Sequence, residues 1–142
     1  MTMIQVILGE KGTGKTKRLI DMTNASAKTE QGQVVFIDDD KRYIYDLPHQ
    51  IRFVDASEYV LGKHRSTDWF FGMLGGMLAT NFDISMIFVD AFLKLVNNKD
   101  YAQLESLFSQ LESLGEAHKV TFVLSVSASP EKLPSFITRY AI

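Results

Sequence analysis

The stretch Gly9-Glu10-Lys11-Gly12-Thr13-Gly14-Lys15-Thr16 matches every position of the pattern G-x-x-x-x-G-K-[ST]. The stretch follows a short apolar run, residues 3–8, and precedes a segment that can be helical, residues 15–28. Small residues let backbone N–H groups converge on phosphate oxygens, and the start of a helix turns the positive end of its dipole toward the same anion. Lys15 can then reach the β- and γ-phosphates, while the Thr16 hydroxyl ligates Mg²⁺. The stretch therefore predicts a loop, residues 9–16, that binds the phosphates of a nucleotide.

Composition places the chain among ordinary globular proteins, with 46 % hydrophobic and 23 % charged residues. A length of 142 residues favours one nucleotide-binding domain over residues 1–142. There is no cysteine, which excludes disulfides and thiolate chemistry. The net charge of −2 argues against nucleic acid as the main partner, because such proteins normally present a basic face. The sequence lacks a signal-peptide pattern and an apolar run of about 20 residues, so we expect a cytoplasmic protein without a membrane span.

Apolar and β-branched runs alternate with helical stretches, which is typical of a parallel sheet covered by helices on both faces. We expect strands at residues 3–8, 34–38, 51–55, 84–89 and 120–126. Helices are expected at 15–28, 66–80 and 98–116, with shorter pieces near 57–61 and 131–141. Gly115 is placed to end the third long helix. The predicted fold is a single three-layer α/β/α domain with a mostly parallel five-stranded sheet.

The most hydrophobic part of the chain is residues 69–78, which include three glycines. In one interpretation this helix packs on the sheet and its glycines permit close approach. In the other it is a surface for a protein partner or for a second copy of the chain. The second interpretation arises because glycine inside a helix costs free energy without a packing reason.

A metal-bound triphosphate also needs a carboxylate beside its loop. The apolar run at residues 84–89 ends in Asp90, which is the Walker B pattern. We expect Asp90 to hold a water of Mg²⁺ opposite Thr16. Ala91 follows, where many P-loop ATPases place a glutamate that orients the attacking water. The group that orients this water must therefore lie elsewhere, or hydrolysis is slow.

The run Phe36-Ile37-Asp38-Asp39-Asp40 resembles the RecA-like branch of the P-loop NTPases, and residues 86–92 are similar to the Walker B strand and turn of that branch. The branch carries its catalytic carboxylate a few residues past the strand that follows the P-loop helix. On this resemblance Asp40 takes the place of the catalytic glutamate, with Asp38 and Asp39 as the next candidates. Because aspartate is one methylene shorter than glutamate, the resemblance implies weaker positioning of the water.

The same resemblance implies ATP as the nucleotide and a sheet order of 51–55, 34–38, 84–90, 120–126, 3–8. The strand at 120–126 then ends near the γ-phosphate, where the branch often carries a polar sensor. Ser125 and Ser127 are the candidates here, and a structural or capping role for their hydroxyls is the alternative. In size and pattern the chain also resembles small, poorly characterised bacterial ATP-binding proteins.

Three functions are consistent with these residues. The leading one is a Mg²⁺-dependent ATP-binding protein with slow hydrolysis, in which Lys15 and Asp40 take part in catalysis. The second is a non-catalytic module that changes a partner surface, such as the 69–78 helix, when nucleotide binds. The third is a small-molecule kinase, in which Asp40 would accept the proton of the acceptor hydroxyl.

Overall fold

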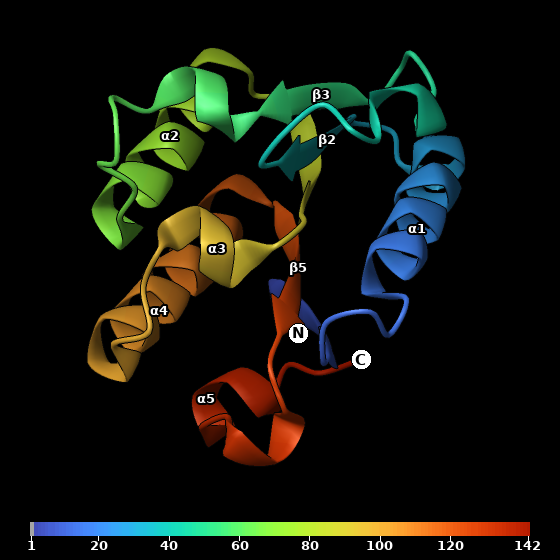
Figure 1. Ribbon diagram of the computed structural model, residues 1–142. Helices are drawn as coiled ribbons and strands as arrows, with labels where there is room; N and C mark the ends of the chain where they lie inside the picture. Colours follow the sequence, from blue (N-terminus) through green and yellow to red (C-terminus); the bar gives the residue numbers. More distant parts are fainter. Residues whose placement is uncertain (1) are drawn as a thin grey trace.

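Five strands run parallel through the centre of the computed structural model, which describes residues 2–142 (Figure 1). They are β1 (Ile4–Gly9), β2 (Gln33–Asp38), β3 (Arg52–Asp55), β4 (Ile84–Val89) and β5 (Thr121–Ser127). Their order in the sheet is β1-β5-β4-β2-β3, and every neighbouring pair is parallel. The predicted fold class and strand order are confirmed. The carboxyl ends of the strands therefore meet at one edge, where the predicted phosphate-binding loop, residues 9–16, also begins.

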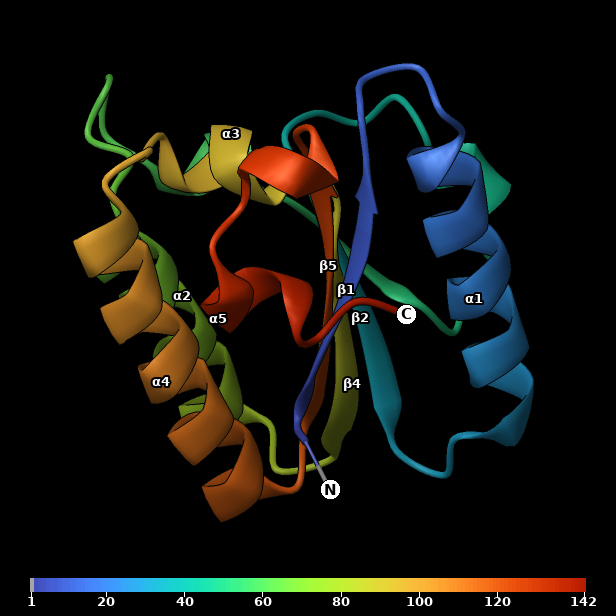
Figure 2. The same cartoon turned by 90° about the horizontal axis from the view of Figure 1, so that it is seen from below.

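Helices cover both faces of this sheet, but unequally. The helices are α1 (Lys15–Thr29), α2 (Thr67–Thr80), α3 (Phe92–Val96), α4 (Tyr101–His118) and α5 (Ser135–Thr138). Short 3₁₀ turns occupy Ile44–Asp46, Ala56–Tyr59 and Pro130–Lys132. Figure 2 shows α1 on one face of the sheet and α2, α4 and α5 on the other. Within residues 2–142, no helix has both the length and the hydrophobicity needed to cross a bilayer.

The larger part of the core lies on the face covered by α2 and α4. There Phe70, Phe92, Phe108 and Phe136 form a chain of edge-to-face contacts, with neighbouring ring centroids 5.6–5.7 Å apart. Each such contact adds about 0.5–1.5 kcal/mol beyond the burial of apolar area. Because the four rings come from α2, α3, α4 and α5, this chain fixes the positions of these helices relative to each other.

The prediction that Gly115 ends the third long helix is wrong. Gly115 is buried inside α4, and the helix ends after His118 at Lys119, which has a φ of 59°. A Cβ at Gly115 would lie 2.6 Å from the Cβ of Met3 and 2.6 Å from the carbonyl oxygen of Val120. The glycine therefore allows α4 to pack closely against the start of the sheet. The same helix begins three residues later than predicted, after Asp100, whose carboxylate accepts a hydrogen bond from the backbone of Ala102.

Neither edge of the sheet offers a long unpaired strand. On the outer side of β1, Val6 donates its N–H to the carbonyl oxygen of Tyr140 at 2.9 Å and accepts from the N–H of Ile142 at 3.0 Å. The other edge is β3, which is only four residues long. A short or covered edge limits unwanted pairing with other chains.

Candidate nucleotide-binding site

The predicted phosphate-binding loop connects β1 to the first residue of α1, Lys15. Gly12 and Gly14 have φ values of 84° and 85°, which strain any residue that carries a Cβ. A Cβ at either position would meet no heavy atom within 4 Å, so it is backbone conformation and not crowding that requires glycine here. At Gly9 the reason is space, because a Cβ would lie 2.5 Å from the Thr13 hydroxyl. The loop thus leaves open space beside Gly12 and Gly14, next to the cavity at the beginning of α1.

Two side chains of the loop turn inward to one carbonyl group. The Thr13 hydroxyl and the Lys15 ammonium donate to the carbonyl oxygen of Glu10, at 2.7 and 2.8 Å. Lys15 is buried, and this burial lowers the pKa of its ammonium, while the charge of Asp90 acts in the opposite direction. The ammonium is therefore held within the loop, and Lys15 lines the adjoining cavity.

Asp90, at the carboxyl end of β4, is held by hydroxyl groups from two other elements. The Thr16 hydroxyl donates to its Oδ2 at 3.0 Å, and the Ser125 hydroxyl donates to its Oδ1 at 2.6 Å. The Ser125 oxygen also accepts the backbone N–H of Ala91 at 2.9 Å. The contact between Thr16 and Asp90 is the pairing that the sequence predicts for a Mg²⁺ site.

Ser125 and Ser127 occupy different surroundings, although they are two residues apart on β5. Ser125 is buried and orients Asp90, which is the structural alternative considered for these hydroxyls. Ser127 is exposed and lines the same cavity as the phosphate-binding loop. Of these two serines, only Ser127 therefore faces the cavity.

The last residue of β2, Asp38, is buried beside Asp90 with 2 % of its surface exposed. Its Oδ1 accepts the N–H of Asp39 at 2.6 Å, and its Oδ2 is buried without a hydrogen-bond partner among residues 2–142. Burial raises the pKa of this carboxyl to about 6, and the negative charges of Asp90 and Asp40 add to the rise. Asp38 therefore has one carboxyl oxygen that is free to accept a hydrogen bond, and a pKa close to neutrality.

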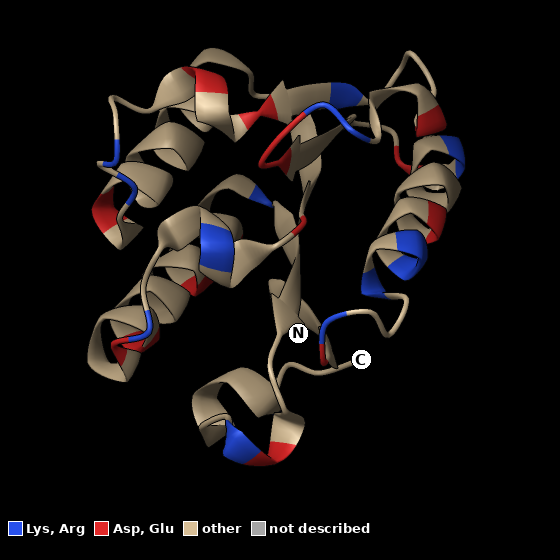
Figure 3. Ribbon diagram, viewed as in Figure 1, with Lys and Arg blue, Asp and Glu red and all other residues tan. Residues whose placement is uncertain are grey.

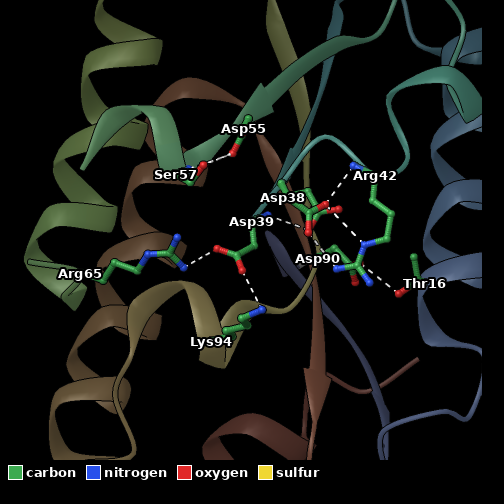
Figure 4. A network of polar contacts seen from close by, with 10 residues as sticks. Thr16, Asp38, Asp39, Arg42, Asp55, Ser57, Arg65, Asp90 and Lys94 are labelled. Atoms are coloured by element: carbon green, nitrogen blue, oxygen red, sulfur yellow. Dashed lines mark hydrogen bonds and ion pairs between the residues drawn. The ribbon is translucent and has the colours of Figure 1, made fainter. Parts of the chain in front are cut away.

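Asp39 points toward two cations from other elements (Figure 4). It forms ion pairs with Lys94 of α3, at 2.8 Å, and with Arg65, which lies just before α2. Burial alone would raise its pKa, but the hydrogen bonds from Lys94 and Arg65 lower the pKa below the usual value. This carboxylate is thus ionised and fixes the turn after β2 to α3 and to the segment leading into α2.

Asp40 has a different environment from its two neighbours. Its side chain is 47 % exposed and is bound by Arg42. The Arg42 guanidinium lies 2.9 Å from Oδ2, and the backbone N–H of Arg42 donates to Oδ1 at 2.9 Å. These hydrogen bonds lower the pKa of Asp40. The structure places Asp38 and Asp39, but not Asp40, in the lining of the cavity at the phosphate-binding loop.

That cavity has a volume of about 960 Å³, which lies within the range of small-molecule sites. It is lined on one side by the phosphate-binding loop and on the other by α3 and the residues after it, including Lys94, Asn98 and Lys99. Figure 3 shows the acidic segments after β2 and β4 between the basic start of α1 and the basic α3. The α3 side is absent from the sequence prediction, and the polar run Asn97-Asn98-Lys99 was its only signal.

Comparison with solved structures identifies a similar fold in other proteins. A KaiC-like protein from the hyperthermophilic archaeon Pyrococcus horikoshii superposes with a TM-score of 0.66 and 15 % identity over 97 % of this chain. The flagellar accessory protein FlaH from Methanocaldococcus jannaschii superposes with a TM-score of 0.55 and 15 % identity over 96 % of this chain. The fold is RecA-like.

The chain spans 68 % of the length of the KaiC-like protein and 65 % of the length of FlaH. The sequence matches no model of a protein family and no curated protein. At this level of identity the likeness concerns the fold, and the chemistry must be argued from the residues of the site. These two neighbours are archaeal proteins, so they do not confirm the expected resemblance to small bacterial ATP-binding proteins.

Proposed function

We propose that this chain is a Mg²⁺-dependent ATP-binding protein that hydrolyses ATP slowly. The observation that carries the proposal is the hydrogen bond from the Thr16 hydroxyl to Asp90, at 3.0 Å. It lies where the glycine loop ends and α1 begins. Residues 9–16 would hold the phosphates through backbone N–H groups and through the Lys15 ammonium. The choice of ATP over GTP, and a cytoplasmic location, rest on the sequence resemblance and composition.

The donor set fits Mg²⁺ only together with a nucleotide. Residues 2–142 contain no cluster of three or more Asp, Glu or His side chains that could hold a metal ion alone. Thr16 would supply a hydroxyl ligand and Asp90 would hold a metal-bound water, while phosphate oxygens and further waters would supply the remaining ligands. When bound, the metal would neutralise charge on the phosphates. The Ser125 hydroxyl keeps the Asp90 carboxylate directed toward Thr16.

Among the three aspartates after β2, the geometry favours Asp38 for orienting the attacking water. Asp38 lines the cavity and keeps one oxygen without a hydrogen-bond partner, whereas Asp40 is exposed and paired with Arg42. With a pKa of about 6, Asp38 is mostly ionised at neutral pH and can accept a hydrogen bond from water. Slow turnover is proposed because Ala91 leaves no glutamate after Asp90, and aspartate has a short reach.

Binding is tested by the effect of ATP with Mg²⁺ on the melting temperature, which a ligand of the folded state must raise. Lys15→Ala should remove this rise. No rise in the wild type at millimolar nucleotide would refute nucleotide binding. Hydrolysis is tested by phosphate release: Asp38→Asn should abolish it and Asp40→Asn should preserve it. The opposite result would return the role to Asp40.

A second candidate function, a nucleotide-responsive binding module, is supported by the two ion pairs of Asp39. They connect the cavity lining to α3 through Lys94 and to the beginning of α2 through Arg65. A nucleotide that attracts either cation would loosen one connection and shift α2, whose residues 69–78 could contact a partner or a second copy of the chain. A module of this kind would show nucleotide-dependent association with negligible phosphate release.

A further inference from the structure

A second cavity of about 640 Å³ lies between α2 and the β3 edge of the sheet, and shares no lining residue with the phosphate cavity. Figure 1 shows β3 at the end of the sheet beside α2. The sheet contributes Val35, Val54 and Ile84, and the helix contributes Trp69, Met73 and Met77. We call this cavity the α2 groove. Its size is that of a small-molecule site, and most of its wall is apolar.

A glycine keeps the α2 groove open. Gly72 lines it, and a Cβ built on Gly72 would meet no heavy atom within 4 Å. Close helix packing therefore does not explain this glycine, although glycine inside a helix is unfavourable. A side chain at position 72 would occupy space that now belongs to the groove. Gly76, one turn later, also has open space but does not line the groove.

Another wall of the α2 groove is held in place by a hydrogen bond. The indole N–H of Trp69 donates to the carbonyl oxygen of Tyr59 at 2.9 Å. Tyr59 also lines the groove and ends the 3₁₀ turn after β3. The bond fixes the large aromatic surface of Trp69 at the side of the groove. Preorganisation of this kind lowers the entropy cost of binding a ligand.

The charged group in the lining of the α2 groove is Arg52, the first residue of β3. Arg52 forms no ion pair within residues 2–142, and no Asp or Glu lines the groove. Thr80 and Asn81 lie in the same lining and add polar groups from the end of α2. An apolar groove with a single unpaired guanidinium is complementary to an apolar molecule that carries one negative charge.

We propose that the α2 groove binds a small organic carboxylate with an apolar body. The body would pack against Trp69, Met73 and Met77, and the carboxylate would accept hydrogen bonds from Arg52. This proposal does not rest on nucleotide binding, because the two cavities share no lining residue.

Trp69 is the only tryptophan of the chain, so tryptophan emission reports on the surroundings of this one side chain in the groove wall. Octanoate, kept below its micelle concentration, should change the emission of Trp69 in a saturable way. Octylammonium has a similar apolar chain with the opposite charge and should bind about tenfold more weakly or worse. The absence of a saturable response to octanoate, or equal binding of the two probes, would overturn the proposal.

Gly72→Leu and Gly76→Leu form a matched pair for the shape of the groove. Both replace glycine by a better helix former, so both variants should melt at or above the wild-type temperature. Only Gly72→Leu should weaken octanoate binding, by at least about tenfold, as measured by calorimetry. Equal affinity in the two variants would contradict the assignment of the ligand to this groove.

The role of Arg52 in recognising the carboxylate is tested by removing or keeping its positive charge. Arg52→Gln should weaken octanoate about tenfold and leave the binding of uncharged octanol unchanged, whereas Arg52→Lys should restore most of the affinity for octanoate. A similar loss for octanoate and octanol in Arg52→Gln would show that Arg52 acts through packing, and would refute recognition of the carboxylate.

Discussion

Replacing Asp38 by asparagine should make the protein more stable at neutral pH while it abolishes ATP hydrolysis. The carboxyl of Asp38 is buried, and burial raises its pKa from 3.8 to about 6. The folded protein therefore binds this proton more tightly than the unfolded chain does. The stability that the group provides is fully present below about pH 4 and is lost as the pH rises through about 6.

The size of the change in the free energy of unfolding follows from the pKa shift of Asp38. About two pKa units correspond to roughly 3 kcal/mol at pH 7.5, and to only about 1 kcal/mol at pH 4.5, where the unfolded chain is also partly protonated. Asparagine keeps an oxygen that can accept the N–H of Asp39, but it buries an amide N–H₂ group where the free Oδ2 lies now. That group costs about 1 kcal/mol. The expected gain is thus about 2 kcal/mol at pH 7.5 and close to zero at pH 4.5.

Urea denaturation of wild type and Asp38→Asn at these two pH values, without nucleotide, measures the difference. Asp40→Asn is the control, because Asp40 is exposed and paired with Arg42, and its replacement should change stability by less than about 1 kcal/mol. A loss of stability in Asp38→Asn at pH 7.5, or an equal gain at both pH values, would refute the reasoning. In the first case the ionised carboxylate would have partners that offset its burial.

Three further changes test other parts of the structure. Gly115→Ala should lower the free energy of unfolding by about 1–3 kcal/mol, because its Cβ would lie 2.6 Å from a carbonyl oxygen; unchanged urea denaturation would show that α4 can move away. Ser125→Ala removes two hydrogen bonds beside the Asp90 carboxylate and should cost about 2–3 kcal/mol, whereas the exposed Ser127→Ala should cost less than about 0.5 kcal/mol. Equal losses in the two variants would contradict the role of Ser125 in orienting Asp90. Lys94→Gln should raise the pKa of Asp39, because one of its two cations is lost; an unchanged pKa in a carboxyl NMR titration would show that the remaining arginine holds the charge alone.

The sequence was sufficient to predict the fold class, the five strands and their order. Residues 34–37 of β2 and 86–89 of β4 are continuous apolar runs, and parallel strands buried on both faces have this pattern. The strand order came from resemblance to the RecA-like branch, and the structure confirms it. The five-residue helix α3 was not predicted, because its length is little more than one turn and gives no helical periodicity.

The three aspartates after β2 illustrate what a sequence does not determine. The alternation of a strand assigns a face to Asp38, its last residue, but it does not extend into the turn that holds Asp39 and Asp40. Their directions depend on partners that are distant in sequence, such as Lys94 and Arg65, or on Arg42 within the same turn. Gly115 was misjudged for a similar reason, since its contact with Met3 joins two distant parts of the chain.

The pairing of β1 has a consequence for how the protein is made. β1 carries the phosphate-binding loop, yet its partner in the sheet is β5, where Ile4 pairs with Phe122. Its outer edge is bonded to residues 140 and 142. At about 5–20 residues per second, a ribosome needs roughly 6–24 s to synthesise the chain between these partners. Throughout that time the loop sequence is present without the sheet that shapes it, so the proposed nucleotide affinity should arise late in folding.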